Sequence, residues 1–141
     1  MSAERIAGSN HGMTYMFAKT FVADLDAMSK FYEDVLGLVP YARHSDMMLG
    51  RPISEIMYQA SYEGGPTFTM ISYTDGNPPP PGEAVQGFVA ADLAAACERA
   101  LAHGGTVPEP IKEVLEYGIK VAFILDPEGH VLEVIEMTGA G

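Results

Sequence analysis

The sequence predicts an α+β fold made of two similar halves, each with the order β-α-β-β-β. The first observation is that Phe21–Leu25 (FVADL) recurs as Val89–Leu93 (VAADL). The second is that the same offset relates Gly37 to Gly105. A period of about 70 residues is also too long for a solenoid repeat and too short for two independently stable domains. We therefore expect one domain with any site in the groove between its halves.

The first half begins with Met13–Val22, which is apolar and β-prone and predicts a strand. Asp24 stands where a helix N-cap belongs, and apolar residues then recur at helical spacing until Gly37, which predicts a helix. The strands expected after it are Val39–His44, Ile56–Tyr62 and Pro66–Tyr73, the last two joined by a Glu63-Gly64-Gly65 turn. Ser45–Ser54 has little strand or helix pattern and is predicted to be a loop over a pocket.

The second half repeats this order after a Pro-rich linker, Thr74–Gly82. A strand near Ala84–Ala90 leads to a helix capped by Asp92 and ended by Gly104-Gly105, and the next strand begins at Thr106. Two further strands, Ile119–Leu125 and His130–Met137, form a hairpin. We therefore divide the chain into a flexible tail (1–12), a first module (13–73), the linker (74–82) and a second module (83–138).

The composition excludes several classes of partner. The 141 residues include 19 acidic and 8 basic side chains, a formal net charge of −11. Nucleic acids and anionic membrane surfaces both require clustered Lys and Arg, so neither is expected. The charge is typical of a soluble, self-repelling protein, and an acidic cleft for a cationic ligand is the alternative interpretation. Cys97 is the single cysteine, and no run approaches a membrane span, so we expect a cytoplasmic protein.

Two motifs carry a resemblance to a known family. Val22–Leu25 with Phe31–Leu38 (FYEDVLGL), and the closing segment Ala122–Glu136 (AFILDPEGHVLEVIE), resemble the vicinal oxygen chelate superfamily. That superfamily includes glyoxalase I, bleomycin-resistance proteins and extradiol dioxygenases. The resemblance implies paired βαβββ modules whose mixed sheets form a cup, the glyoxalase-like fold. It also implies a homodimer, because such cups are commonly completed by a second chain.

The resemblance further implies where a divalent metal would be bound. Metal-using relatives place one ligand on the first and one on the last strand of each module. In this sequence those positions fall on Phe17, Met70, Val85 and Glu133. Phe and Val cannot donate to a metal, and a thioether is a poor ligand for the ions concerned. Glu133 alone matches, so we expect no metal and no cofactor. The four histidines match none of these positions and are expected to be surface or packing residues.

The same resemblance and the alternation of strand faces indicate which side chains line the cup. Two of them are charged, Lys19 and Glu133. The others expected to contact a ligand are Tyr15, Phe17, Phe68, Met70, Ser72, Val85 and Gly87. Lys19 and Glu133 either form a structural ion pair or serve a ligand, with Lys19 as the anchor of an anionic or carbonyl group and Glu133 as the acid or base. The sequence leaves both interpretations open.

Three functions are consistent with these observations. The first is a small-molecule-binding protein or metal-independent enzyme, of lyase or isomerase type, that acts on a largely apolar carbonyl or carboxylate compound. The second is a protein that sequesters a compound, as bleomycin-resistance proteins do. The third is a metal-dependent glyoxalase I-like lyase with atypical ligands. The identity of the ligand cannot be read from the sequence.

Overall fold

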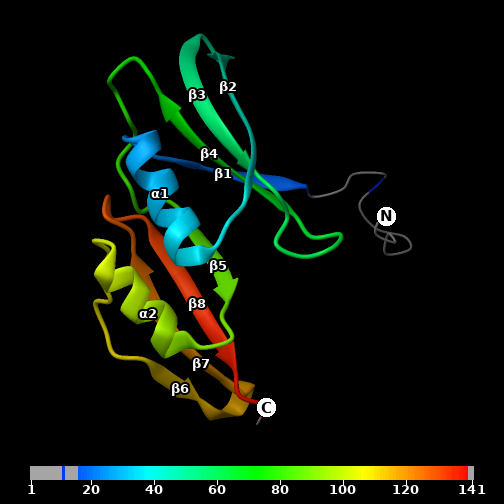
Figure 1. The fold of residues 1–141 in the computed structure, drawn as a ribbon, viewed down its shortest axis with the longest axis vertical. Coiled ribbons are helices and arrows are strands. Elements are labelled where there is room, and N and C mark those ends of the chain that lie inside the picture. Colours follow the sequence, from blue (N-terminus) through cyan, green and yellow to red (C-terminus); the bar gives the residue numbers. More distant parts are fainter. Residues whose placement is uncertain (1–10, 12–15, 140–141) are drawn as a thin grey trace.

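The computed structural model describes residues 11 and 16–139 and contains two four-stranded sheets, each with one helix packed on it (Figure 1). The first half contains β1 (Phe17–Phe21), α1 (Leu25–Leu36), β2 (Pro40–Met48), β3 (Arg51–Tyr58) and β4 (Thr67–Tyr73). The second contains β5 (Val85–Val89), α2 (Leu93–Ala102), β6 (Lys112–Val114), the 3-10 helix η2 (Leu115–Tyr117), β7 (Ile119–Leu125) and β8 (Val131–Met137).

Both sheets are mixed and have the same topology. Their orders are β1-β4-β3-β2 and β5-β8-β7-β6; in each, the first strand pairs in parallel with the last, and the other pairs are antiparallel. The predicted α+β fold of two βαβββ halves is therefore confirmed. Strand β1 begins at Phe17 and β5 at Val85, which is the same offset as that between Leu25 and Leu93 in the sequence.

The two helices begin in the same way and end differently. The Asp24 carboxylate accepts a hydrogen bond from the Ala27 amide and the Asp92 carboxylate one from the Ala95 amide, both at 3.0 Å, which confirms both predicted caps. Gly37 ends α1 in the left-handed conformation, with φ of 72°. Gly105 does not repeat that role, because His103 is the C-cap of α2 and Gly104 is the residue with positive φ.

The predicted loop Ser45–Ser54 is wrong. Strand β2 continues through it to Met48, and β3 begins at Arg51. The turn consists of Leu49 and Gly50, with φ of 51° and 80°, as in the two-residue hairpins whose twist suits the flanking strands. No strand begins at Thr106, which forms only an isolated bridge with Leu125. The edge strand β6 begins further along the chain, at Lys112.

One hydrophobic core joins the two halves. It includes Phe31 and Tyr32 of α1, Met70 of β4, Leu93 of α2 and Leu132 of β8, all nearly excluded from solvent. Because both helices and both sheets contribute to it, the halves form a single structural unit. The helices of the described part of the chain are all too short or too polar to cross a membrane.

Candidate functional site

Each sheet has one face packed on its helix and one face turned away, which we call the open face. In β4, Phe68 stacks on Tyr32 of α1 and Met70 lies in the core. The alternate residues Thr69, Ile71 and Tyr73 therefore belong to the open face. The β1 residues paired with the first two of these are Lys19 and Phe21, so they share that face.

A partly buried ion pair lies on the open face of the first sheet. Lys19 Nζ is 2.9 Å from Glu55 Oε2, and the exposed fractions of the two side chains are 29% and 7%. His44 Nε2 approaches the other Glu55 oxygen at 3.5 Å. A carboxylate this buried requires a charged partner, and Lys19 supplies it. Lys19 is therefore paired with Glu55 rather than with Glu133.

An aromatic stack borders the ion pair. The rings of Phe21 and Tyr73 are stacked with their centroids 4.9 Å apart. The Arg51 guanidinium lies 3.5 Å from the centroid of Tyr73, a cation–π contact. Arg51 also donates to both oxygens of Asp75 and to the Asn77 carbonyl, at 2.7–2.9 Å. These hydrogen bonds raise the pKa of Arg51 and lower the pKa of Asp75.

A cleft of about 370 Å³ lies between the two halves, and we call it the linker cleft. Its lining includes Lys19, Phe21, Arg51 and Tyr73. Lys19 and Phe21 come from the first half, and the wall includes the linker prolines Pro79–Pro81. His130 ends the turn between β7 and β8, and Val131 begins β8. The cleft thus has apolar walls, two cations (Lys19 and Arg51) that are already paired with carboxylates, and two further titratable groups, Glu83 and His130. Such a pocket suits a small, largely apolar molecule with one polar group.

A buried polar network forms one side of the linker cleft. His130 Nδ1 lies 2.8 Å from Asp126 Oδ2, and His130 Nε2 lies 2.8 Å from the Phe21 carbonyl oxygen. The Tyr32 hydroxyl donates to Asp126 at 2.9 Å, and burial followed by the Asp126 charge raises the pKa of this tyrosine. The hydrogen bond with Asp126 raises the pKa of His130, although burial opposes it. Burial alone would raise the pKa of Asp126, but its hydrogen bonds with His130 outweigh this and lower it.

The open face of the second sheet is mostly apolar, with one carboxylate on β8 and Lys112 on the edge strand β6. Leu132 and Val134 lie in the core, so Val131 and Glu133 are on the open face, paired with Val85 and Gly87 of β5. Glu133 forms no hydrogen bond or ion pair with the residues that the structure describes. Its apolar neighbours are exposed: Val85 by 54%, Val89 by 67% and Phe123 by 38%.

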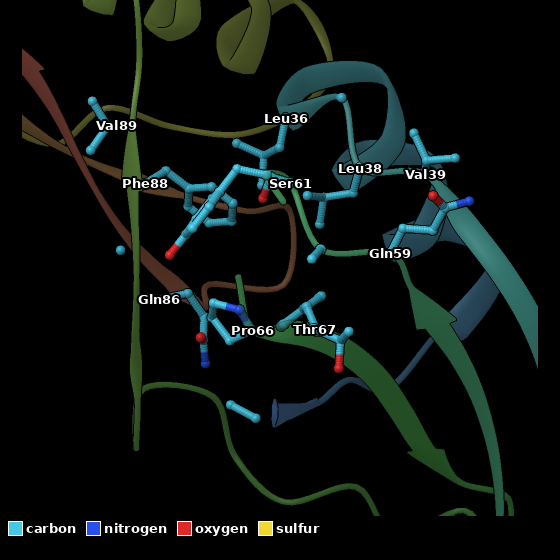
Figure 2. Close-up of a pocket in the computed structure, with 16 residues that line it drawn as sticks. Leu36, Leu38, Val39, Gln59, Ser61, Pro66, Thr67, Gln86, Phe88 and Val89 are labelled. Atoms are coloured by element: carbon cyan, nitrogen blue, oxygen red, sulfur yellow. The ribbon is translucent and has the colours of Figure 1, made fainter. Parts of the chain in front are cut away.

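A larger cleft, of about 760 Å³, lies where the end of α1 approaches β5. Figure 2 shows Gln86, Phe88 and Val89 of β5 on one side and Leu38 and Val39, which follow α1, on the other. Its lining side chains carry no charge. The predicted site residues Phe68 and Gly87 border this cleft, whereas Lys19 borders the linker cleft. The structure therefore does not gather the predicted set at one place.

The predicted facing of β4 is wrong by one residue. Met70 is completely buried in the core, Phe68 packs on Tyr32, and the Ser72 hydroxyl donates to the Ala23 carbonyl at 3.1 Å. All three lie on the helix side, and of the three only Phe68 borders a cleft, the larger one. Phe17 and Val85 do lie on the open faces. Tyr15 lies outside the described residues.

The corrected facing of β4 changes one of the four positions at which metal-using relatives would place a ligand. Glu133 pairs with Gly87, and Lys19, the counterpart of Gly87, pairs with Thr69. The counterpart of Glu133 is therefore Thr69, not Met70. Phe17, Thr69, Val85 and Glu133 offer one strong donor, which does not fit a divalent metal centre. The described residues contain no group of three or more His, Cys, Asp or Glu arranged to hold a metal.

Glu55, the partner of Lys19, was missed in the sequence because it falls between the predicted loop Ser45–Ser54 and the predicted strand Ile56–Tyr62. Ile53, Glu55 and Met57 share one face of β3, and this alternation was the available signal. The contact between Arg51 and Tyr73 requires β3 to begin at Arg51, within the segment that was predicted to be a loop.

Comparisons with known proteins agree with this architecture. The family model described as "Glyoxalase/Bleomycin resistance protein/Dioxygenase superfamily" matches residues 14–134. A glyoxalase family protein from Bacillus cereus is similar in structure, with a TM-score of 0.73 and 16% identity over 94% of this chain and 98% of that one. A glyoxalase/bleomycin resistance protein from Albidiferax ferrireducens T118 gives a TM-score of 0.66 and 23% identity over 86% and 97%.

A variant of glyoxalase I from Zea mays gives a TM-score of 0.64 and 19% identity, over 87% of this chain and 46% of that one. No curated protein matches the sequence. At these identities the similarity to solved structures shows the fold alone.

Proposed function

We propose that this chain, which belongs to the glyoxalase/bleomycin resistance protein/dioxygenase superfamily, binds a small, largely apolar carbonyl or carboxylate compound in the linker cleft. The observation that carries the proposal is the Lys19–Glu55 pair beside this cleft. An ammonium group has three N–H donors. The described residues give Lys19 hydrogen bonds to Glu55 only, which leaves N–H groups for a ligand oxygen.

The surroundings of Lys19 support the same ligand class. Phe21 and Tyr73 provide a flat apolar wall, and the burial of apolar ligand surface contributes about 25 cal/mol per Å² before the costs of binding. Glu55 neutralises the Lys19 ammonium, so a neutral carbonyl adds no uncompensated charge to the cleft, whereas a ligand carboxylate has to share the ammonium with Glu55.

Three probes that share one ring test this proposal: benzoate, benzamide and benzylamine. We expect benzoate and benzamide to raise the melting temperature and to shift NMR signals of the cleft residues, and benzylamine to do neither. Lys19→Met should weaken benzoate binding about tenfold or more, as expected when a charge-assisted hydrogen bond is lost. Lys30→Met is the matched control, because Lys30 is exposed on α1 and pairs with Asp34. Equal affinity of the wild type and Lys19→Met would refute the site, and preferential binding of benzylamine would favour sequestration of a cationic compound.

A second candidate function, lyase or isomerase chemistry, is favoured by Glu133. A carboxylate on an apolar open face, without a partner among the described residues, suits a general base. It would remove a proton from the carbon next to a ligand carbonyl and return a proton to the same or a neighbouring carbon. This role requires one ligand to contact both Lys19 and Glu133. Hydrogen–deuterium exchange of the acetophenone methyl group, followed by NMR, should be fast with the wild type and slow with Glu133→Gln. Equal rates would exclude Glu133 as the base.

We also propose that the protein is a homodimer that acts in the cytoplasm. Val85, Val89 and Phe123 form an exposed apolar surface on the second sheet, and such surfaces often mark protein interfaces. The cytoplasmic assignment rests on the acidic composition and on a single, buried cysteine, Cys97. Light scattering at micromolar concentration should give the mass of two chains, and the mass of one chain would refute the dimer.

A further inference from the structure

The turn between β7 and β8 contacts the first half where β1 passes into α1. Glu128 Oε1 and Oε2 accept hydrogen bonds from the Ala23 and Asp24 amides, both at 2.8 Å. His130 Nε2 lies 2.8 Å from the Phe21 carbonyl oxygen. Residues 126–130 therefore hold the β1–α1 junction by three hydrogen bonds, and we call this arrangement the junction clamp.

The partners of His130 determine its protonation state. Nδ1 contacts the Asp126 carboxylate, and Nε2 contacts a backbone carbonyl. Both partners can only accept hydrogen bonds, so each ring nitrogen must donate one. An imidazole has two N–H groups only when it is protonated. The geometry thus requires the imidazolium form, because a neutral ring would direct a nitrogen lone pair at an acceptor oxygen within hydrogen-bonding distance.

The charges around His130 favour this cation. Asp126 contacts it directly, and Glu128 Oε1 lies 3.9 Å from Nε2. The Tyr32 hydroxyl, which comes from α1, donates to Asp126 and does not compete for the imidazolium protons. Lys19, Arg51 and Glu83 also line the linker cleft with His130, but Lys19 and Arg51 are neutralised by Glu55 and Asp75.

We propose that the junction clamp is a pH-sensitive coupling between the two halves, closed when His130 is protonated and released at the Phe21 carbonyl when it is neutral. Phe21 and His130 both line the linker cleft, so release would free one wall of it. This consequence for the cleft rests on the proposed function, whereas the clamp itself does not.

The direction of the pH effect follows from the shifts of the pKa values. The pKa of His130 is raised above its ordinary value of about 6.5, so its contribution to stability is complete below about pH 6.5. That contribution is lost as the pH rises through the raised value. The pKa of Asp126 is lowered, so its contribution is complete above about pH 3.9 and is lost as the pH falls through the lowered value. The clamp is therefore strongest between about pH 4 and pH 6.5.

The second half has no equivalent titrating clamp among the described residues. The start of α2 is held by the carboxylate of Glu136, which accepts from the Leu93 amide at 2.8 Å and belongs to β8 of the same half. A rise in pH should therefore loosen the start of α1 and leave the start of α2 unchanged.

NMR of the full-length protein between pH 5 and pH 9 tests the clamp. We expect His130 to titrate above its ordinary pKa of about 6.5 and to carry protons on both ring nitrogens at pH 6. The melting temperature should fall by several degrees as the pH rises through this titration. The fall should be absent in His130→Gln and retained in His103→Gln, a histidine on the exposed end of α2. Titration of His130 at or below its ordinary pKa, or one unprotonated ring nitrogen at pH 6, would overturn the proposal, and both can be measured on the wild type even if the variant does not fold.

Benzoate separates the clamp from the cleft, because it stays ionised throughout this pH range. We expect its dissociation constant to rise several-fold in the wild type as His130 loses its proton, and to stay constant in His130→Gln. If His130 titrates as expected but benzoate affinity does not change, the link between clamp and cleft is refuted. If benzoate does not bind at any pH, the proposed function fails while the titration of His130 still decides the clamp.

Discussion

The two halves share a backbone plan but differ in the chemistry of their open faces. The first carries Lys19, Glu55 and Arg51, all in ion pairs, beside an aromatic stack. The second carries exposed valines and one carboxylate, Glu133, that has no partner among the described residues. The residues retained between the halves, Asp24 and Asp92 above all, are those that start helices. The duplication has thus preserved the residues that determine the fold, while the open faces have diverged.

The halves also differ in what holds each helix start. Glu128 reaches across from the second half to α1, whereas Glu136 holds α2 from within its own half. The first half therefore depends on the second at the junction of β1 and α1, and the reverse dependence is not seen among the described residues. This asymmetry places one of the contacts between the halves, that of the β7–β8 turn with the start of α1, beside the linker cleft.

The largest effect is expected from Met70, the residue first assigned to the open face. Met70→Ala should lower the free energy of unfolding by about 2–5 kcal/mol, because it leaves a cavity in a fully packed core. Met47→Ala, at a residue of β2 that is 61% exposed, should cost less than about 0.5 kcal/mol. Urea denaturation measures both values. Similar costs for the two variants would show that Met70 does not face the core.

A smaller effect should distinguish the two glycines related by the duplication. A Cβ atom on Gly105 would lie 2.8 Å from the Leu125 carbonyl oxygen and 3.1 Å from the ring of Phe31, so Gly105→Ala should cost about 1–3 kcal/mol by overpacking. Gly37 has open space around it and a positive φ, so Gly37→Ala should cost about 1 kcal/mol.

Asparagine is the control for this pair. It tolerates the left-handed conformation, so Gly37→Asn should recover part of the loss caused by alanine. The larger side chain should make Gly105→Asn worse than Gly105→Ala. If asparagine improved both positions, the two glycines would serve the same conformational purpose, and the difference drawn between the helix ends would be wrong.

The topology could be predicted from the sequence because the determinants of the helices are local. Asp24 fixed the start of α1, whereas the assignment of Phe17 and Lys19 to one face of β1 came from the family resemblance and the alternation of strand faces. The facing of β4 had no such anchor: Thr69, Met70, Ile71 and Ser72 are all buried, so both faces of this strand are covered, and the alternation of polar and apolar residues over 67–70 reverses at Ile71 and Ser72. The site was harder to predict than the fold, because its contacts depend on strand pairing between distant segments. Glu55 meets Lys19, and Arg51 meets Tyr73, only when β1, β3 and β4 form one sheet.

The smallest expected effect concerns metal. The positions that would hold a metal in the two halves are Phe17 and Thr69 in the first and Val85 and Glu133 in the second, and only Glu133 is a strong donor. Incubation with EDTA should therefore leave the melting temperature unchanged, and metal analysis of the purified protein should give well under one divalent ion per chain. A metal ion that binds only the folded state stabilises it by mass action. Removal of a bound ion by EDTA would therefore lower the melting temperature. Stoichiometric nickel, zinc or iron that is lost in Glu133→Gln would show that Glu133 and further ligands outside these four positions complete a metal centre. In that case the open faces would hold a metal site and not an apolar site.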